Sequence, residues 1–186
     1  MRAATTMDSV LVANRGEIAL RVIRAVHETG GRAVAVYPED DRDSLHVRRA
    51  DQAITLPGEG VAAYLDVAAI IDAAVASGCT SVHPGYGFLS ENAELARGCE
   101  RAGLVFIGPA PETLEMLGDK ARARAFAVAR GVPVLPGTDG PTTLAQARTF
   151  AAEHGAVMLK ALAGGGGRGM RAVTDPHDLA EAFERC

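Results

Sequence analysis

The sequence lacks the features that would direct it to nucleic acid or into a membrane. Its formal net charge of -4 would repel a phosphate backbone, and it has no basic cluster interleaved with aromatic residues. Its longest apolar stretches, such as residues 67–76, are interrupted by charged residues such as Asp72 and fall short of the ~20 residues that a membrane span needs. We therefore expect neither nucleic acid nor a membrane as a partner.

Cysteine is also scarce, and its positions exclude several kinds of site. Cys79, Cys99 and Cys186 have neither an even count nor the spacing of metal ligands, so we expect reduced thiols and no metal site in this chain. No Ser-His-Asp or Cys-His arrangement has catalytic spacing. Because residues 1–8 lack the apolar run of a secretory signal, a cytoplasmic location is expected.

Lysine is rare in this sequence, because 17 of the 19 basic residues are arginine. Only Lys120 and Lys160 are lysines. Since arginine fills the basic positions elsewhere, a lysine indicates a place where the larger planar guanidinium does not fit. Both lysines are therefore candidate phosphate ligands, although a solvated lysine at the end of a strand is the ordinary alternative for Lys160.

The first half of the chain alternates between short apolar runs and segments with helical spacing. After the apolar run at residues 9–13, Ile18, Val22 and Val26 recur on one helix face. Such alternation predicts an α/β fold with a Rossmann-like, mostly parallel sheet and right-handed crossovers. Strands are predicted at residues 9–13, 33–37, 52–56, 80–82 and 104–107, with helices after residue 16 and at about 64–76 and 93–102.

The second half predicts a helical connector followed by the beginning of another domain. Residues 111–130 are alanine-rich without a strand signal. Further on, the pattern predicts helices at 144–153 and 177–185 and strands at 156–160 and 170–173. We expect three parts, 1–108, 109–133 and 134–186. Because the last part holds only one strand–loop–strand unit, we expect the chain to be an incomplete piece of a larger protein.

The loop between the last two predicted strands is rich in glycine. Residues 164–169 (GGGGRG) let backbone N–H groups approach an anion without obstruction by Cβ atoms, and Arg168 adds positive charge. Lys160 precedes this loop and could neutralise a phosphate oxygen. The loop is not a Walker motif, because no Lys-Ser or Lys-Thr follows and the next element is a strand. A flexible hairpin loop is the alternative.

The turn after the first strand argues against a dinucleotide cofactor. A nicotinamide site would need several glycines where this chain has Asn14, Arg15 and the single Gly16. Asp40 and Asp41 follow the second strand, where a ribose-binding acid could lie. We interpret these two acids as part of a solvated loop.

The loop at residues 83–92 (HPGYGFLSEN) is a second candidate for lining a site. It is rich in glycine and polar groups and follows the carboxyl end of a strand, where ligands collect in open α/β sheets. The alternative is a purely structural loop in which His83 caps a helix or a carbonyl group. The candidate site residues in this loop are His83, Gly85, Glu91 and Asn92.

Five stretches taken together resemble biotin carboxylases, which belong to the ATP-grasp superfamily. The match is collinear, covers essentially the whole chain from Met7, and is highly specific because two of the stretches are ten residues long. These stretches are residues 12–21 (VANRGEIALR), 83–92 (HPGYGFLSEN), 106–109 (FIGP), 118–120 (GDK) and 164–170 (GGGGRGM).

This resemblance implies a Rossmann-like pre-ATP-grasp domain that binds no dinucleotide, followed by the start of an ATP-grasp domain whose glycine loop closes over ATP. It also implies that Arg21 and Arg24 lie at a subunit interface, with solvated helix charges as the alternative. Ala163 departs from the family pattern, which leaves the motion of the loop open. The implied ATP contacts are Lys120, Lys160, Gly164, Gly165, Gly166, Gly167, Arg168, Gly169 and Met170.

The reaction that the resemblance implies is carboxylation of carrier-bound biotin by ATP and bicarbonate, with Mg²⁺. The implied partners are a biotin carboxyl carrier domain, a carboxyltransferase and a second copy of the enzyme. Catalytic and metal-binding residues are expected beyond Cys186, so the chain alone is expected to be inactive. The alternatives are another ATP-grasp ligase, of carbamoyl-phosphate or purine-pathway type, or a non-catalytic nucleotide-binding module. The final carboxyl acceptor is not determined by this sequence.

Overall fold

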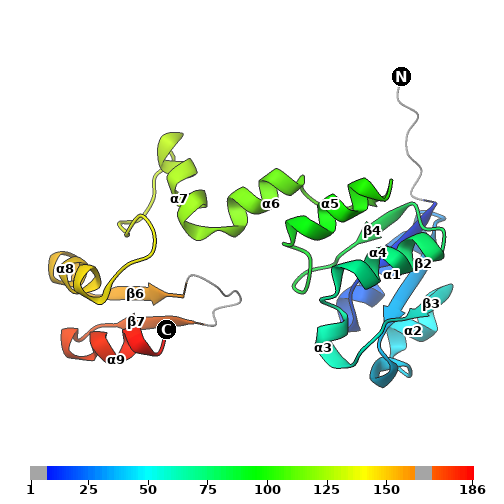
Figure 1. The fold of residues 1–186 in the computed structure, drawn as a ribbon, viewed down its shortest axis with the longest axis horizontal. Coiled ribbons are helices and arrows are strands. Elements are labelled where there is room, and N and C mark those ends of the chain that lie inside the picture. The colour runs from blue at the N-terminus through cyan, green and yellow to red at the C-terminus, as the bar shows by residue number, and fades with distance from the viewer. Residues whose placement is uncertain (1–7, 162–168) are drawn as a thin grey trace. The chain divides into compact units, whose positions relative to one another are not determined.

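The computed structural model describes residues 8–161 and 169–186 (Figure 1). Contacts between Cα atoms divide the chain into two compact units, Met1–Glu115 and Met116–Cys186, called here the first and second units. The finer division into parts 1–108, 109–133 and 134–186 stays a prediction. Each unit is described by itself below.

The first unit contains a five-stranded parallel sheet in the order β3-β2-β1-β4-β5. The central strand β1 is buried at all four positions, as its uninterrupted apolar sequence predicts for a strand covered on both faces. The predicted α/β class and parallel sheet are therefore confirmed. The strands are β1 (Ser9–Val12), β2 (Arg32–Tyr37), β3 (Gln52–Thr55), β4 (Ser81–His83) and β5 (Val105–Phe106).

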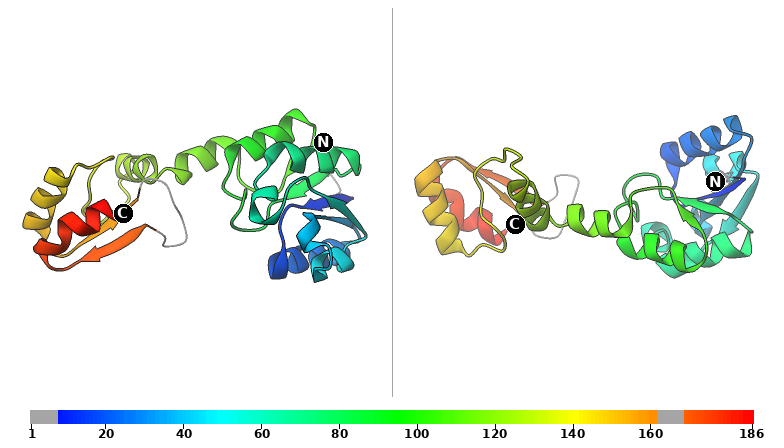
Figure 2. Two further views of the ribbon diagram at one scale, coloured as in Figure 1. Left: turned by 60° about the horizontal axis from the view of Figure 1, so that its bottom comes forward. Right: turned by 90° about the horizontal axis from the view of Figure 1, so that it is seen from above.

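Alternate side chains of the strands feed two separate cores, one on each face of the sheet. Val10 and Val12 pack against α1 (Gly16–Glu28), whereas Leu11 points to the face covered by α4 (Val67–Ala76) and α5 (Ala93–Arg101). Figure 2 shows the sheet between these two helical layers. This doubly covered sheet leaves its strand ends as the places where polar loops gather.

Short helices not predicted from the sequence occupy the loops at the carboxyl ends of β2 and β3. They are a 3₁₀ turn (Glu39–Asp41), α2 (Leu45–Arg49) and α3 (Gly60–Ala63). The helix predicted at about residues 64–76 begins later, as α4, because the Asp66 side chain accepts a hydrogen bond from the Ala69 N–H and caps it. Tyr64 therefore lies before α4, where it is buried.

The second unit places two helices against one face of a two-stranded antiparallel hairpin. Its core joins Ala147 and Ala151 of α8 to Val173 and Leu179. The stretch predicted to be helical after residue 110 contains two helices, which separate at Asp119, whose side chain caps the second. The elements from the connector onward are α6 (Pro111–Gly118), α7 (Lys120–Ala129), α8 (Leu144–His154), β6 (Val157–Lys160), β7 (Met170–Val173), a 3₁₀ turn (Pro176–Asp178) and α9 (Leu179–Glu184).

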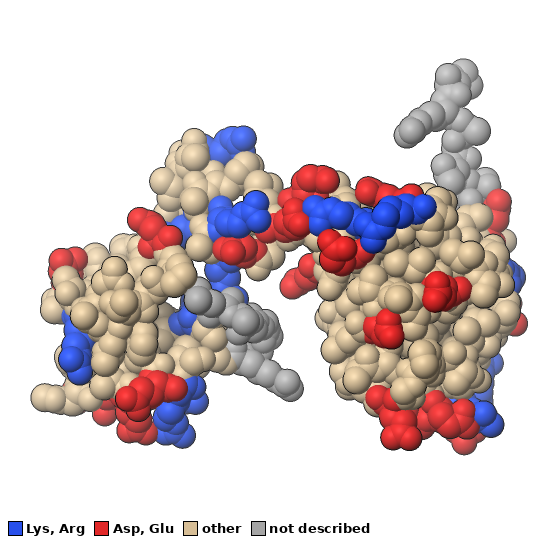
Figure 3. Space-filling view, viewed as in Figure 1, with Lys and Arg blue, Asp and Glu red and all other residues tan. Residues whose placement is uncertain are grey.

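Charges of both signs are interleaved on the molecular surface. On the face drawn in Figure 3, basic and acidic side chains lie close together near α5 and α6. Arg97 pairs there with Glu94 at 3.3 Å and with Glu115 at 2.6 Å, so the two helices are joined by an ion-pair network. Within the described residues, no helix is both long and apolar enough to cross a membrane.

Candidate functional site

Both lysines of the chain line one pocket of the second unit. The pocket has a volume of about 780 Å³, and its walls come from the start of α7, the loop at residues 134–142 and strand β6. Lys120 is the first residue of α7, and Lys160 is the last residue of β6. The structure thus brings together two residues that are 40 positions apart and that sequence composition had selected as phosphate ligands.

The register of the β6–β7 hairpin places apolar side chains and the Lys160 ammonium group on one face, called here the apolar platform. Residues directly opposite each other in an antiparallel pair point to the same face. Met158 pairs with Ala172 and Lys160 with Met170, so these four side chains share one face. Met158 and Met170 are 49% and 43% exposed because the helices cover the other face, where Val157 and Leu159 pack. A flat apolar ring carrying phosphates fits such a surface.

The start of α7 is capped by the carboxylate of the preceding residue, Asp119. The first N–H groups of a helix lack partners within the helix, and its dipole favours negative charge there. Asp119 accepts hydrogen bonds from the N–H groups of Ala121 at 2.8 Å and Arg122 at 2.9 Å. This cap fixes where α7 begins and so places the Lys120 side chain at the pocket.

Only the base of the glycine-rich loop lies within the described residues. The Ala161 N–H donates to the Gly169 carbonyl at 2.8 Å, and the Cys186 thiol donates to the same carbonyl at 2.8 Å. Gly169 has a φ of +72°, which favours glycine at this position. The remaining predicted contacts, Gly164, Gly165, Gly166, Gly167 and Arg168, and the departure at Ala163 lie outside the described residues.

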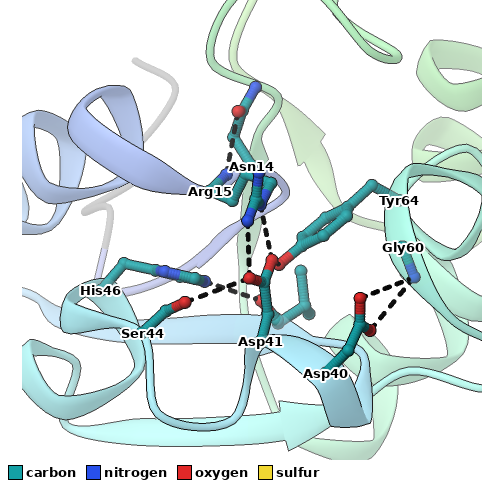
Figure 4. A network of polar contacts seen from close by, with 9 residues as sticks. Asn14, Arg15, Asp40, Asp41, Ser44, His46, Gly60 and Tyr64 are labelled. Atoms are coloured by element: carbon teal, nitrogen blue, oxygen red, sulfur yellow. Dashed lines mark hydrogen bonds and ion pairs between the residues drawn. The ribbon is translucent and has the colours of Figure 1, made fainter.

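In the first unit, a second polar centre occupies the carboxyl edge of the sheet (Figure 4). Asp41 was predicted to be a solvated loop acid, and this prediction is wrong: the residue is 8% exposed. It accepts hydrogen bonds from Arg15 Nε at 2.5 Å and Nη2 at 2.6 Å, from Tyr64 Oη at 2.8 Å and from Ser44 Oγ at 3.1 Å. The bidentate guanidinium and two hydroxyl groups replace the water that this carboxylate loses on burial.

These contacts shift the pKa of each partner in a direction set by its charge. The hydrogen bonds from Arg15, more than the opposing effect of burial, lower the pKa of Asp41 from 3.8 to about 2. Burial, with the hydrogen bond to Asp41, raises the pKa of Tyr64. At neutral pH the centre therefore holds a fixed carboxylate and a neutral phenol.

We expect Asp41 to make the first unit's stability depend on acid pH. Because its folded pKa lies below its unfolded value, its stabilisation is complete well above pH 4 and is lost as pH falls through about 2. The shift corresponds to about 2 kcal/mol, of which roughly half is lost at pH 3. The unfolding free-energy difference between wild type and Asp41→Asn should shrink accordingly between pH 7 and pH 3.

Tyrosine fluorescence during urea unfolding of the chain would measure this difference. All three tyrosines, Tyr37, Tyr64 and Tyr86, lie in the first unit, and the sequence has no tryptophan. The signal therefore follows this unit without contribution from the second. A difference that stays constant from pH 7 to pH 3 would show that the carboxylate charge of Asp41 contributes nothing to stability.

Two of the candidate residues in the loop at residues 83–92 accept hydrogen bonds from nearby backbone N–H groups. His83 Nδ1 accepts from the Gly85 N–H at 2.9 Å, and burial lowers the pKa of His83. Asn92 caps α5 by accepting from the Leu95 N–H at 3.0 Å. Glu91 is exposed. His83 and Asn92 thus shape the loop, and a direct role in binding stays a prediction for all four candidates.

Asn14 and Glu17, which were not predicted as site residues, contact the loop at residues 83–92. Asn14, which is 3% exposed, donates from Nδ2 to the carbonyl oxygens of Pro84 at 2.7 Å and Tyr86 at 2.9 Å. The Tyr86 hydroxyl contacts Glu17. The sequence signal for Asn14 was its position directly after the first strand. That turn was interpreted only as lacking the glycines that a dinucleotide site needs.

Arg21 and Arg24 lie on the outer surface of α1, where both are exposed. Arg24 pairs with Glu28 one helical turn later, at 2.8 Å. A surface pair of this kind contributes little to stability, which leaves both arginines available for contact with another molecule. Their predicted place at a subunit interface stays a prediction.

Side chains that can bind metal ions are scattered through the described part of the chain. Within residues 8–161 and 169–186, no group of three or more His, Cys, Asp or Glu side chains could hold a metal ion. The magnesium ligands that the resemblance places beyond Cys186 stay a prediction.

Comparison with protein families gives two matches that divide the chain. Residues 6–114 match the model described as biotin carboxylase, N-terminal domain. Residues 119–186 match the model described as carbamoyl-phosphate synthase L chain, ATP binding domain. The pocket with both lysines lies within the second match, and the Asp41 centre lies within the first.

Individual relatives are similar to this chain over almost its whole length. Pyruvate carboxylase of Bacillus subtilis (strain 168) is 50% identical over 97% of this chain, which spans only 16% of that protein. The biotin carboxylase domain of a single-chain bacterial carboxylase is 54% identical, with a TM-score of 0.83 over 96% of this chain and 39% of that one.

A further structure was solved with nucleotide and bicarbonate. It is the biotin carboxylase domain dimer of Hydrogenobacter thermophilus 2-oxoglutarate carboxylase, in complex with MgADP, ADP and bicarbonate. It is 43% identical, with a TM-score of 0.91 over 97% of this chain and 40% of that one. Since the first family match alone covers more than half of the sequence, this chain belongs to the biotin carboxylase family, of which it contains the amino-terminal domain and part of the ATP-binding domain.

Proposed function

We propose that the protein containing this chain carboxylates biotin with bicarbonate at the expense of ATP, and that the second unit of the chain binds the nucleotide. The observation that supports this most is the pocket lined by both Lys120 and Lys160, next to a sheet face that carries Met158 and Met170. The 2-oxoglutarate carboxylase domain with the same fold was solved with MgADP and bicarbonate.

In this proposal the apolar platform receives the adenine ring and the two ammonium groups receive the phosphates. ATP would transfer its terminal phosphoryl group to bicarbonate, giving ADP and carboxyphosphate. Carboxyphosphate would release phosphate and pass CO₂ to N1′ of biotin, which loses its proton. Lys120 and Lys160 would stabilise charge on the phosphoryl oxygens during transfer, and Mg²⁺ would supply further positive charge.

The remaining partners follow from the same assignment. Carboxybiotin on a carrier domain would move to a carboxyltransferase, and Arg21 and Arg24 on α1 would contact a second copy of the chain. The relatives differ in their acceptors, since one is a pyruvate carboxylase and another a 2-oxoglutarate carboxylase. The final acceptor is therefore left unassigned.

The full-length protein should fix radiolabelled bicarbonate onto free biotin only when ATP is present. One ADP should form for each carboxybiotin, measured by acid-stable label after methylation and by a coupled ADP assay. The 186-residue chain alone is a matched control that should fix no label, because it spans only 39% of a related biotin carboxylase domain. Absence of label with the full-length protein, at saturating ATP, would contradict the proposal.

The second family match favours one alternative, because its description is that of a carbamoyl-phosphate synthase. In that case ATP hydrolysis by the full-length protein would depend on bicarbonate and ammonia rather than on bicarbonate and biotin. The match over residues 6–114 argues against it. Comparison of ADP formation with biotin and with ammonia decides between the two reactions.

A further inference from the structure

Two segments from distant parts of the first unit meet where the strand order of its sheet reverses. β1 pairs with β2 on one side and with β4 on the other. In open α/β sheets, ligands bind beyond the carboxyl ends of the strands at such a switch point. The segments that follow β1 and β4 here are the turn at residues 14–16 and the loop at residues 84–88. Side chains of the turn hold the loop in place.

Asn14 provides a direct connection between the two segments. Its Nδ2 group donates to two loop carbonyls, those of Pro84 and Tyr86, at 2.7 and 2.9 Å. Its Oδ1 atom accepts from the Arg15 N–H at 2.9 Å, which fixes the orientation of the amide. All three hydrogen-bonding positions used are buried or partly buried, so breaking them would leave carbonyl groups without partners.

Arg15 provides an indirect connection from the same turn. Its guanidinium holds Asp41, Asp41 accepts from the Tyr64 hydroxyl, and the Tyr64 ring stacks on Phe88 (Figure 4 shows the polar part). The two rings have centroids 5.3 Å apart and planes 6° apart. A continuous set of contacts therefore runs from the turn after β1 to the far end of the loop.

The loop conformation needs these connections because it is strained. Phe88 is the one non-glycine residue with a positive φ in the described part of the chain, at +41°, a conformation that is unfavourable for a residue with a Cβ atom. Gly85 and Gly87 flank the exposed Tyr86 with φ values of +68° and +65°. Tyr86 at the loop tip is 59% exposed. Burial of this side chain therefore does not offset the strain of the loop backbone.

We propose that Asn14 and Arg15 are positioning residues, which hold the loop at residues 84–88 in the conformation that contacts a substrate other than the nucleotide. This inference rests on the proposed carboxylation. The nucleotide is assigned to lysines of the second unit, so a displaced loop affects the use of bicarbonate or biotin and leaves the use of ATP unchanged. Neither residue touches the substrate itself.

The variant Asn14→Asp in the full-length protein tests this directly. Aspartate keeps the size and the acceptor for the Arg15 N–H, but it has no donor and places a carboxylate against two carbonyl oxygens. We expect hydrogen exchange of the amides at residues 85–92 to become about tenfold faster, equivalent to about 1.4 kcal/mol. The KM for biotin or bicarbonate should rise about tenfold, with the KM for ATP changed less than about twofold.

Two further variants separate positioning from general destabilisation. Tyr64→Phe removes the hydroxyl contact with Asp41 and leaves Asn14 intact, so it should raise the same KM by a few-fold. Ser44→Ala removes another hydrogen bond to the Asp41 carboxylate, but Ser44 is not part of the contacts that run to the loop. This variant should therefore match wild type in KM and in hydrogen exchange at residues 85–92. Tyr64→Phe keeps the test decisive where Asn14→Asp fails to fold.

Unchanged exchange at residues 85–92 in Asn14→Asp, or an equal rise in the KM for ATP, would overturn the positioning role. A KM effect of Ser44→Ala equal to that of Tyr64→Phe would overturn the Arg15 route. Wild-type protein that fixes no bicarbonate would instead refute the proposed function. The exchange measurement needs no activity, so the two failures are distinguishable.

Discussion

Replacement of Lys160 by methionine should lower kcat/KM for ATP on the order of 10- to 100-fold in the full-length protein. The ammonium group ends the apolar platform of the second unit and is assigned to a phosphate oxygen. A hydrogen bond to a charged group contributes about 1.5–3 kcal/mol, and each 1.4 kcal/mol corresponds to tenfold. Methionine keeps the apolar stem, so the loss reports on the charge. Steady-state kinetics with varied ATP measures it.

Lys160→Arg should restore little of this activity, because the guanidinium is larger and planar. Arg171→Met is the matched control. Arg171 lies on the neighbouring strand β7 and pairs with Leu159. Its side chain is therefore on the other face of the hairpin from Lys160. We expect its kcat/KM to stay within about twofold of wild type. Equal losses in Lys160→Met and Arg171→Met would exclude a specific phosphate contact at Lys160.

Gly85→Ala should destabilise the first unit by about 2–4 kcal/mol. Its φ of +68° is unfavourable for any residue with a Cβ atom, and an added Cβ would lie 2.6 Å from Nδ2 of Asn14. That amide is buried and bonded to two carbonyls, so it cannot withdraw without losing both hydrogen bonds. Urea unfolding followed by tyrosine fluorescence gives the change in free energy.

Gly87→Ala separates the contact from the backbone strain. Gly87 has almost the same φ, +65°, but an added Cβ there would have no atom within 4 Å. We expect it to cost only the strain, about 1 kcal/mol. If both variants lose the same stability, the close approach of Asn14 to Gly85 has no energetic consequence and the loop is held by other contacts.

The main elements of the fold could be predicted because their signals are local. The apolar run of β1 and the helical spacing of Ile18, Val22 and Val26 each occupy a few neighbouring residues. The order of such segments was enough for the parallel sheet. The antiparallel hairpin strands β6 and β7 were also predicted, within one residue of their observed bounds.

The Asp41 centre could not be predicted because its partners are distant in sequence. Arg15 and Tyr64 lie 26 and 23 residues away, on loops that follow other strands. An acidic run such as residues 39–43 is typical of a solvated loop when its neighbours in space are unknown. The short α2 and α3 were missed for a similar reason, since their apolar residues are too few for a periodic signal.

The two lysines were found by a different kind of signal. The rarity of lysine selected Lys120 and Lys160 without any knowledge of structure, and both line one pocket. Asn14 shows the limit of that approach, because asparagine is common in turns and only the fold reveals its contact with residues 70 and 72 positions away. Composition can identify residues of a rare type, whereas a positioning residue is recognised only from its contacts in the folded structure.

The most direct test of nucleotide binding at this pocket is labelling with an ATP acyl phosphate. A lysine amine close to the bound phosphates attacks the acyl carbonyl, forms an amide and releases ATP. Since the 186 residues contain only two lysines, mass spectrometry of this segment of the full-length protein gives an unambiguous result. We predict acylation of Lys120, Lys160 or both, and protection by excess MgATP. No labelling of either lysine, or labelling that MgATP leaves unchanged, would contradict nucleotide binding by these residues.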